Sequence, residues 1–585
     1  MKTLKPYLNG YRREAILAPL FKMLEALFDL FVPLVVADII DVGLTKDMHY
    51  IAIRVLLMIL LAVLGLTVSI TAQYFAAKAS VGFATGLRQD AFQHILSLSY
   101  SKLDTLGSST LITRMTSDIN QTQNGLNMGL RLLLRSPFIV FGSVIMAFFV
   151  NPHAAIIFLI AVPVLAVVVY GIMLLSIPLF AKVQTQLDHV TDLTRENLTG
   201  VRVIRAFRKE QEQVQNFDHA NDALTRLNEV VGRISALLNP VTYVLINIAT
   251  IFLIRQGALE VYHGEMATGQ VVALYNYMAQ MVIELIKLSS LIITLNKAIA
   301  CANRVAAILA VEPGQDFPES LSLDNTLDSP AGSTTSVGGT VEFQDVSFTY
   351  EGSSEPALSH ASFTASAGEM IGIIGGTGSG KSTLVNLIPR FYDNTQGSIQ
   401  LNGNALATFT KEHLLEEIAV VPQKAVLFSG TIRENLKYGN PDATDEELWE
   451  ALTAAQAKDV VLAKKGALDY MLEQNGRNLS GGQKQRLTIA RALVKHPQVL
   501  ILDDSASALD FATEAALRQA ITALPCTTFW VSQRASSILH ADQILVLDDG
   551  NLVGQGSHET LLQNCSVYQE IYYSQFPEER KEVTK

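Results

Sequence analysis

The sequence predicts a multi-domain membrane protein, in which a helical membrane-spanning half precedes an α/β domain. Three observations support this fold class. Apolar stretches long enough to span a bilayer occupy the first half, strand and helix patterns alternate in the second half, and the second half contains a glycine-rich loop pattern. The 585 residues are 49% hydrophobic and only 17% charged, whereas soluble domains average about 25% charged residues. This composition excludes a wholly soluble enzyme.

Charge and cysteine content exclude further classes. The 44 basic and 55 acidic side chains give a net charge of −11, which disfavours nucleic acid as a partner. Cys301, Cys526 and Cys565 lie far apart without a CxxC spacing, so neither a zinc site nor a disulfide framework is indicated. We expect three buried or incidental thiols in a reducing compartment.

The first half contains about six apolar stretches near the ~20 residues that a spanning helix needs. They lie near residues 15–40, 55–77, 132–150, 154–176, 237–255 and 270–295. The first stretch is longer than the apolar region of a signal peptide, and no small-residue cleavage site follows it, so we expect no cleaved leader. The predicted protein crosses the membrane several times, with the lipid bilayer as its environment.

The distribution of lysine and arginine predicts the orientation. These residues are frequent at the N-terminus and in the long connections near 78–131 and 177–236, whereas the short connections near 42–50, 151–153 and 256–269 contain only Lys46. Because basic residues favour the cytoplasmic side, we expect both termini and the α/β domain in the cytoplasm and the helices in the plasma membrane. The long connections have few Gly or Pro residues and are predicted to be helices that extend into the cytosol.

Two segments in these connections, residues 110–118 and 196–207, place apolar side chains among polar ones at the far end of a predicted helix. Such a patch is expected to dock on another domain. The alternative is helix packing inside the bundle.

Several ionisable or polar side chains lie within the predicted spans. They are Lys22, Glu25 and Asp29 in the first, Asn247 in the fifth, and Tyr275, Asn276, Tyr277, Gln280, Glu284 and Lys287 in the last. A charge at mid-bilayer costs about 2.5–3.5 kcal/mol, so these groups should face a wet or paired interior, which suggests a translocation pathway. The alternative is that Lys22 and Glu25 pair locally and that groups near the interface snorkel to the membrane surface.

The two halves are joined by a segment rich in Pro, Ser, Gly, Asp and Thr without apolar periodicity. We therefore predict a membrane domain over residues 1–311, a linker over 312–340 and a soluble α/β domain over 341–585. The last begins with an alternating strand pattern over residues 341–350.

The strongest motif of the α/β domain is the P-loop at residues 375–383, which directly follows an apolar strand at 370–374 and matches G-x-x-x-x-G-K-[ST]. Glycines let backbone N–H groups converge on phosphate oxygens, and the following helix presents its positive end to the same anion. Lys381 should reach the β- and γ-phosphates, and Ser382 should bind Mg²⁺. The predicted nucleotide-binding residues are Gly375, Gly376, Thr377, Gly378, Ser379, Gly380, Lys381, Ser382 and Thr383.

A second apolar strand, at residues 498–502, ends in Asp503. A carboxylate there can hold Mg²⁺ through its hydration shell, as the Walker-B aspartate of P-loop enzymes does. An apolar strand that ends in two aspartates is common, so this signal is weak when taken alone.

Residues 479–483 have the sequence LSGGQ, and together with the P-loop they make the chain resemble the ATP-binding cassette (ABC) family. Six spans ahead of one cassette resemble a half-transporter of the ABC exporter class, close to the bacterial multidrug exporters. The resemblance implies bound ATP and Mg²⁺, and a second half-transporter as partner. It also implies roles for single residues: Tyr350 stacks on adenine, Gln423 contacts the metal or the attacking water, Glu473 contacts the cytoplasmic helices, residues 507–510 form the D-loop, and Ser480, Gly481, Gly482 and Gln483 bind the ATP of the partner's site.

Two positions depart from the family pattern. Asp504 stands where the family usually has a glutamate that polarises the attacking water, and Gln533 stands where the family usually has a histidine that contacts the γ-phosphate. Aspartate is one methylene shorter, and a misplacement of ~1 Å can cost about 10²-fold in rate. Glutamine cannot carry the charge of an imidazolium or exchange a proton as imidazole does. The candidate catalytic residues are Asp504, Gln533 and Gln423, and the metal ligands are Ser382, Gln423 and Asp503.

The pattern resembles one subunit of a heterodimeric exporter that contributes a degenerate site and an intact signature. We therefore predict an ATP-driven export ATPase for drugs or other amphipathic small molecules. A homodimeric lipid or drug flippase and an ATP-gated channel or regulatory subunit remain alternatives. The apolar spans exclude a soluble P-loop enzyme.

Overall fold

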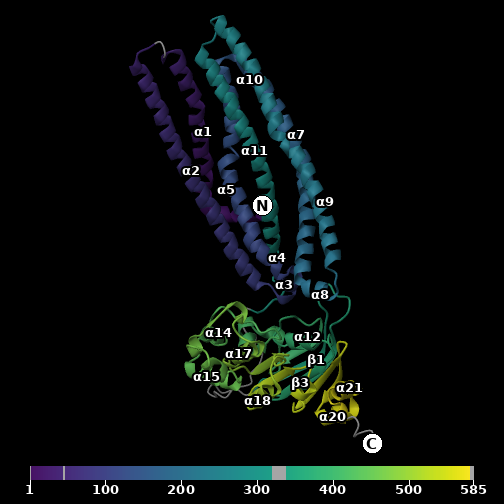
Figure 1. Ribbon diagram of the computed structural model, residues 1–585. Coiled ribbons are helices and arrows are strands. Elements are labelled where there is room, and N and C mark those ends of the chain that lie inside the picture. Colours follow the sequence, from purple (N-terminus) through teal and green to yellow (C-terminus); the bar gives the residue numbers. More distant parts are fainter. Residues whose placement is uncertain (1, 44–45, 319–337, 580–585) are drawn as a thin grey trace. The chain divides into compact units, whose positions relative to one another are not determined.

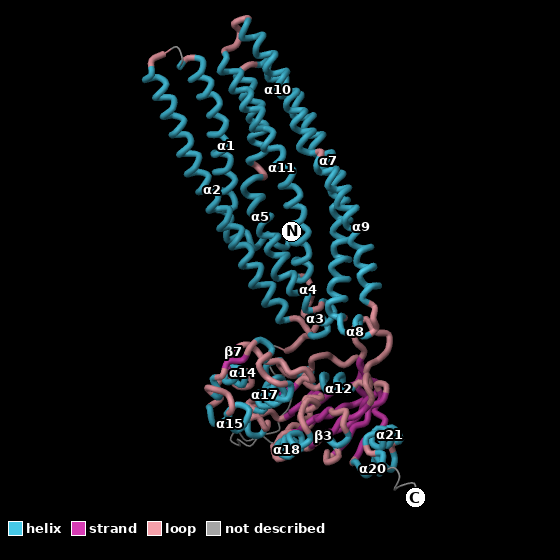
Figure 2. The backbone as a smooth tube through the Cα atoms, viewed as in Figure 1, coloured by secondary structure: helices cyan, strands magenta, loops and turns pink. Residues whose placement is uncertain are grey.

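The computed structural model describes residues 2–43, 46–318 and 338–579 and divides into two compact units (Figure 1). The helical unit comprises Met1–Leu96 and Ser109–Val311, and the α/β unit comprises Ser97–Ser108 and Glu312–Lys585. Within the described residues, the helical unit contains only helices and their connections, and the strands belong to the α/β unit (Figure 2). The predicted fold class is confirmed.

The helical unit is built from long helices that run side by side (Figure 1). Its elements are the 3₁₀ helix η1 (Lys2–Tyr11), α1 (Arg12–Asp41), α2 (Met48–Ser97), α4 (Ser108–Thr113), a π-helical turn (Arg114–Asp118), α5 (Ile119–Leu132), α6 (Arg135–Val150), α7 (Pro152–Thr199), α8 (Val201–Ala206), α9 (Glu210–Ala236), α10 (Leu238–Tyr262) and α11 (Thr268–Leu309). Helix α11 packs against α1, α5 and α6, whereas α7 packs against α9 and α10.

The predicted apolar stretches lie on helices, but the stretch at 132–150 is interrupted by a turn at residues 133–134 between α5 and α6. Among the described residues, five helical segments are long and apolar enough to cross a membrane. The remaining stretch, at residues 15–40, lies on α1, which has 30 residues but carries Lys22, Glu25 and Asp29 in its middle. Helices α2 and α7 have 50 and 48 residues, hence lengths of about 75 and 72 Å, against a hydrocarbon thickness of about 30 Å. The helices therefore extend beyond the bilayer, as the composition of the long connections predicts.

The charged residues of α1 belong to an ionic network in which Lys22, Glu25 and Arg135 are largely buried and Asp29 is half-buried. Lys22 Nζ lies 2.5 Å from Glu25 Oε2, and the Arg135 guanidinium lies 3.7 Å from Glu25, 3.0 Å from Asp29 and 2.6 Å from Glu284. The local pairing of Lys22 with Glu25 is thus correct but incomplete, because Arg135, which the sequence analysis did not single out, joins three carboxylates. The network connects α1, α6 and α11 and provides the paired interior that ionisable groups in a span require.

The α/β unit contains a ten-stranded mixed sheet in the order β5-β4-β1-β2-β12-β11-β3-β10-β9-β6. Its strands are β1 (Val341–Phe348), β2 (Leu358–Ala365), β3 (Met370–Gly375), β4 (Gln396–Leu401), β5 (Asn404–Ala405), β6 (Ile418–Val421), β9 (Val499–Asp503), β10 (Thr527–Val531), β11 (Gln543–Asp548) and β12 (Asn551–Gly556), and β7 (Gly430–Thr431) pairs with β8 (Met471–Leu472). Strands β11, β3, β10, β9 and β6 run parallel, whereas β1 pairs antiparallel with β2 and β4.

The central parallel strands β3, β9 and β10 are buried along their whole length, which explains their continuous apolar runs. The helices of this unit pack against the sheet or against one another beside it. They are α12 (Lys381–Leu387), α13 (Lys411–Glu417), α14 (Ile432–Lys437), α15 (Asp445–Ala454), α16 (Lys458–Leu462), α17 (Gly481–Leu493), α18 (Phe511–Thr522), α19 (Ala535–Ile538), α20 (His558–Asn564) and α21 (Ser566–Gln575), with short 3₁₀ turns at Leu406–Thr408, Ala467–Asp469 and Gln474–Gly476. Ligands of such sheets bind at the carboxyl ends of parallel strands, where β3, β9 and β10 place the predicted site residues.

Most of the predicted linker, residues 319–337, lies outside the described residues. Its described flank at 312–318 has no helix or strand, and β1 begins at Val341 as predicted. The three cysteines are buried and free, which agrees with the expectation of buried thiols.

A short segment between α2 and α4 belongs to the α/β unit although the sequence places it among the membrane helices. Helix α3 (Tyr100–Leu106) stacks Tyr100 on Phe391 with ring centroids 4.4 Å apart, and Asp104 accepts a 2.6 Å hydrogen bond from the Tyr392 hydroxyl. Lys102 pairs with Glu351 at 2.9 Å. No sequence pattern marks this docking segment.

The two segments that were expected to dock behave differently. In residues 110–118, Leu111 is buried and Asp118 accepts hydrogen bonds from Arg304 of α11, so these two residues pack within the helical unit, whereas Ile112 is exposed. Docking by this first segment stays a prediction. In residues 196–207, α8 leaves Val203 and Phe207 exposed. Docking by this second segment stays a prediction.

Candidate nucleotide-binding site

The P-loop connects β3 to α12 at the centre of the parallel strands. Gly378 and Gly380 adopt φ values of +84° and +94°, which L side chains rarely adopt. A Cβ atom on Gly380 would also lie 2.6 Å from the carbonyl oxygen of Ala357. These glycines therefore give the loop the tight curve that points backbone N–H groups toward a phosphate.

The Lys381 side chain lies against the backbone of this loop. Its Nζ donates hydrogen bonds to the carbonyl oxygens of Gly375 and Gly376 at 3.1 and 2.5 Å. Burial lowers the pKa of Lys381, and the carboxylates of Asp504 and Asp503 oppose that shift. The ammonium group is thus positioned at the loop and can exchange its carbonyl partners for phosphate oxygens.

The structure brings together Ser382 and Asp503, two of the candidate metal ligands. The Ser382 hydroxyl donates a 3.0 Å hydrogen bond to Asp503 Oδ1, and Asp503 is only 8% exposed. Burial raises the pKa of Asp503, with a further increase from Asp504, whereas Ser382 and Lys381 lower it. A hydroxyl and a carboxylate are the hard oxygen donors that Mg²⁺ prefers, so this pair fits the ion. Bound Mg²⁺ would neutralise phosphate charge.

The three candidate catalytic side chains also meet. Asp504 Oδ2 accepts hydrogen bonds from Gln423 Nε2 and Gln533 Nε2, both at 3.3 Å. Asp504 follows β9 with φ +45°, and its N–H donates to the carbonyl oxygen of Val531 at 3.1 Å. Burial raises the pKa of Asp504, and the bond from Gln423 and the charge of Lys381 oppose this. The backbone therefore fixes a carboxylate between two neutral amides.

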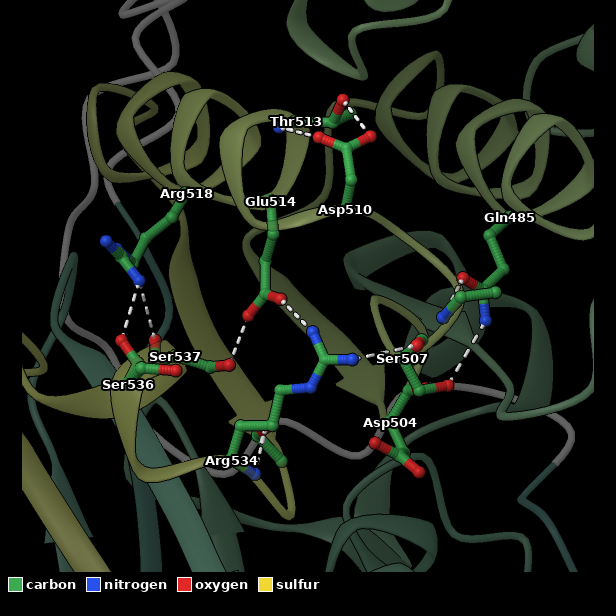
Figure 3. A network of polar contacts seen from close by, with 12 residues as sticks. Gln485, Asp504, Ser507, Asp510, Thr513, Glu514, Arg518, Arg534, Ser536 and Ser537 are labelled. Carbon is green, nitrogen blue, oxygen red and sulfur yellow. Dashed lines mark hydrogen bonds and ion pairs between the residues drawn. The ribbon is translucent and has the colours of Figure 1, made fainter. Parts of the chain in front are cut away.

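A network that the sequence analysis missed holds the loop of Gln533 (Figure 3). Glu514 of α18 is buried and accepts hydrogen bonds from Arg534 Nη1 at 3.1 Å and from the Ser537 hydroxyl. Arg534 also lies over the Phe511 ring at 5.0 Å. A polar cavity of about 250 Å³ lies between Asp504, Gln533 and this network. Arg534 directly follows Gln533, which was the available sequence signal.

The C-terminal helix α21 fixes the same loop from the other side. Gln575 Nε2 donates to the carbonyl oxygen of Gln533 at 2.9 Å, and Gln575 Oε1 accepts from the Ala535 N–H at 2.9 Å. No local pattern could reveal this contact, because the two glutamines are 42 residues apart.

Tyr350 lies beside the P-loop helix. Its hydroxyl is 3.1 Å from Thr383 Oγ1, and its ring contacts Tyr392 edge-on with centroids 5.4 Å apart. Tyr392 in turn donates the hydrogen bond to Asp104 of α3. An aromatic chain thus connects the position expected for adenine with the docked segment α3.

The signature residues form the start of α17. Ser480 Oγ accepts from the Gln483 N–H at 3.4 Å, and Gln483 Oε1 accepts from the Ser480 N–H at 3.1 Å, which is a reciprocal capping box. Two residues further on, Gln485 Oε1 accepts a 3.0 Å hydrogen bond from the Ala508 N–H, which joins the signature helix to the D-loop. Within the described part of the chain, no hydrogen bond joins the signature to the P-loop.

These features define a class: a P-loop ATPase domain covalently joined to a bundle of membrane-spanning helices. Two family models divide the chain in the same way. The model of the ABC transporter transmembrane region matches residues 15–285, and the model described as ABC transporter matches residues 358–507.

Relatives extend the match to nearly the whole chain. An uncharacterized ABC transporter ATP-binding protein of Bacillus subtilis, YfiB, is 36% identical over 577 residues, which cover 98% of this chain and 99% of the relative. An ATP-dependent lipid A-core flippase of Desulfotalea psychrophila is 32% identical over 544 residues, which cover 92% and 93%. The solved structure of a bacterial Atm1-family ABC exporter with ATP bound matches with a TM-score of 0.77 at 24% identity, covers 96% of this chain and 99% of that chain, and shows the same fold.

The chain belongs to the ABC transporter family. It is a half-transporter of the exporter fold, with a membrane domain and one ATP-hydrolysing cassette. The resemblance drawn from the P-loop and LSGGQ is thereby confirmed at the level of the family.

Proposed function

We propose that this chain is one subunit of an ATP-driven exporter that pairs with a different half-transporter and contributes the slower of two nucleotide sites. The observation that carries the proposal is the contact of Asp504 with Gln423 and Gln533. The carboxylate is one methylene shorter than the family's glutamate and is engaged by two amides. Neither amide can accept and return a proton at neutral pH as imidazole does. Hydrolysis at this site is therefore slow.

The same site keeps the parts that bind nucleotide. We assign phosphate binding to residues 375–383, Mg²⁺ binding to Ser382, Asp503 and Gln423, and adenine stacking to Tyr350. The 3.0 Å contact between Ser382 and Asp503 and the position of Lys381 at the loop support this assignment. In this proposal the site holds ATP and closes the two cassettes without turning over quickly.

The intact signature serves the partner's site. Residues 480–483 are held at the start of α17 by the capping box, and no described hydrogen bond directs them to the chain's own P-loop. Head-to-tail pairing of two cassettes would place Ser480 and the two glycines on the ATP of the partner, which supplies the catalytic glutamate and histidine of that site. Glu473, exposed before the signature, would contact the cytoplasmic helices.

In this account, closure of the cassettes reopens the membrane helices toward the outside, and hydrolysis in the partner's site resets them. The cargo is a drug or another amphipathic small molecule that moves out across the plasma membrane, with both termini in the cytoplasm. The ionic network around Arg135 pairs three carboxylates with the Arg135 guanidinium and the ammonium groups of Lys22 and Lys287. A neutral network of this kind lines a pathway without favouring one sign of charge.

A second candidate is a homodimeric flippase for lipids or drugs. The observation that favours it is the 32% identity to a relative named for flipping lipid A-core. In such a dimer both nucleotide sites would contain Asp504 and Gln533.

Trapping with vanadate separates the two candidates. The transporter, purified from its source membranes, is incubated with radiolabelled 8-azido-ATP with and without vanadate and then irradiated. If the two chains form an asymmetric pair, this chain is labelled by bound nucleotide without any increase from vanadate. The label that vanadate traps should then be at least about tenfold stronger on the partner. Trapping on this chain to the same extent as on any companion contradicts the degenerate site.

A further inference from the structure

An apolar groove of about 660 Å³ lies between α7 and α10 in the helical unit. It is lined mainly by aliphatic and aromatic side chains. They include Ile156, Ile160 and Val164 of α7 and Leu245, Ile248 and Phe252 of α10. Both helices belong to segments that are long and apolar enough to cross a membrane, so the groove lies where hydrocarbon chains are the surrounding solvent. Its volume falls in the range of about 300–1,000 Å³ that is usual for ligand sites.

The groove becomes polar where α7 begins and α10 approaches its end. His153, Arg255 and Gln256 line this part. The Gln256 amide donates to buried Glu260 at 2.8 Å, and Asn151 donates to the same carboxylate while its Oδ1 caps the start of α7. The Glu260 carboxylate is thus buried and bonded to neutral amides.

Arg255 is exposed at the groove, and it makes no ion pair or hydrogen bond with any residue that the structure describes. Arg54 at the same end of the bundle shows the contrast, because its Nε pairs with Asp38 at 2.7 Å. The start of α11 is bound to the end of α1 by the Gly269 N–H and Asp41, which shows that these helix ends share one edge of the unit. Arg255 is therefore a cation at the polar end of the apolar groove, and its five N–H donors are available to a ligand.

We propose that this groove binds one anionic phospholipid, with its phosphate on Arg255 and an acyl chain between α7 and α10. The guanidinium matches two phosphate oxygens. Charge complementarity thus selects a lipid anion rather than a neutral lipid, and the aliphatic lining selects a chain rather than a free phosphate. The lipid is a bound component of the membrane domain, and its binding is independent of what the transporter exports.

Native mass spectrometry of the intact protein in mild detergent tests this. The purified protein is mixed with phosphatidylglycerol or phosphatidylcholine at graded concentrations, and retained lipid is counted. Wild-type protein is expected to bind phosphatidylglycerol at least about tenfold more tightly than phosphatidylcholine. Arg255→Gln should remove this preference, Arg255→Lys should keep part of it, and the matched control Arg54→Gln should keep it.

A second variant tests the apolar part. Ile160→Trp fills the groove and should reduce retention of phosphatidylglycerol at least about tenfold while Arg255 is intact. Inorganic phosphate at millimolar concentration should not displace the lipid. Equal retention of phosphatidylglycerol by Arg255→Gln and Arg54→Gln, displacement by phosphate, or a dimer whose second copy fills the groove and leaves no lipid bound would each overturn the proposal.

Discussion

Gln533 Nε2 donates a 3.3 Å hydrogen bond to Asp504 Oδ2, so the two positions at which this chain departs from the family pattern contact each other. They lie 29 residues apart, at the ends of the adjacent parallel strands β9 and β10. Because Gln423 donates to the same oxygen, a change at either position alters the hydrogen bonding of the other. The two departures therefore form one hydrogen-bonded cluster with Gln423.

Restoring the family residues should accelerate hydrolysis. In the assembled transporter, the double change Asp504→Glu and Gln533→His is expected to raise ATP turnover by about 10- to 100-fold, because it restores carboxylate reach and a group that can exchange a proton. The measurement is phosphate release at saturating ATP. Asp459→Glu is the matched control, since it lengthens an exposed carboxylate of α16 that belongs to no part of the nucleotide site. A double variant as slow as wild type would show that these side chains do not limit the rate.

Changing the signature should stop hydrolysis in a site that this chain's P-loop does not form. Ser480→Arg places a bulky cation where the partner's nucleotide is expected, and we predict loss of more than about 90% of the transporter's ATPase activity with ATP binding to this chain unchanged. Ser557→Arg is the control, because Ser557 caps α20 in the same way and either substitution costs about 1 kcal/mol of helix capping. Full activity in Ser480→Arg would contradict the shared-site account.

We expect Asp503 to lower the stability of the nucleotide-free folded protein, although the nucleotide site needs its carboxylate. Its pKa is raised by burial, so the folded state binds the proton more tightly than the unfolded state does, and the charged form costs stability at neutral pH. Asp503→Asn keeps an acceptor for Ser382 and removes that cost. The apparent Tm of the nucleotide-free protein should rise at pH 7, at roughly 2–4 °C per kcal/mol, and the gain should shrink as the pH falls toward the pKa of Asp503. Stabilisation by Mg²⁺ with ATP should be lost, and an unchanged Tm at pH 7 would refute the argument.

The link between Tyr392 and α3 can be measured by amide exchange. Tyr392→Phe keeps the aromatic stacking and removes only the hydrogen bond to Asp104, which contributes about 1 kcal/mol. Amides of α3 should therefore exchange about five-fold faster. Tyr438→Phe is the control, since Tyr438 is 65% exposed and stacks on Phe428 away from α3. Equal protection of α3 in both variants would show that the bond does not hold the segment.

The ionic network of the helical unit should depend on Arg135. Arg135→Gln leaves Glu25, Asp29 and Glu284 without their shared guanidinium, and loss of one partner from a buried network costs about 3–5 kcal/mol. Lys287→Gln, at a side chain that is 46% exposed, should cost far less. The apparent thermal stability of both variants in detergent provides the comparison. Equal losses would mean that the buried contacts of Arg135 contribute no more than a surface pair.

Much of the architecture could be predicted from the sequence because it depends on local patterns. Apolar length located the membrane helices, and the P-loop pattern together with the apolar strand before Asp503 located the residues that meet at the carboxyl ends of β3 and β9. Contacts formed only by tertiary packing were missed. In the sequence, Tyr100 cannot be told from any other aromatic residue at a helix start, because its contact with Phe391 forms only in the folded unit. Arg135 likewise looks like an ordinary basic residue at a membrane boundary, although three carboxylates surround it in the structure.

In the nucleotide site, too, local sequence patterns predicted some features, whereas contacts made by tertiary packing were missed. Residue identity predicted the altered pair Asp504 and Gln533, but it could not show that the two side chains touch or that Glu514, Arg534 and Gln575 hold the loop between them. These supporting residues have no motif, because their positions follow from how α18 and α21 pack. The catalytic and binding roles assigned to the site residues stay predictions until they are tested.

Native mass spectrometry of the tagged chain, purified in mild detergent from the membranes of its own source cell, tests the central claim most directly. The account predicts recovery with a different half-transporter in a one-to-one ratio, whose sequence carries a glutamate and a histidine at the positions of Asp504 and Gln533. Recovery as two copies of this chain alone would contradict it, because both nucleotide sites would then contain the slow cluster.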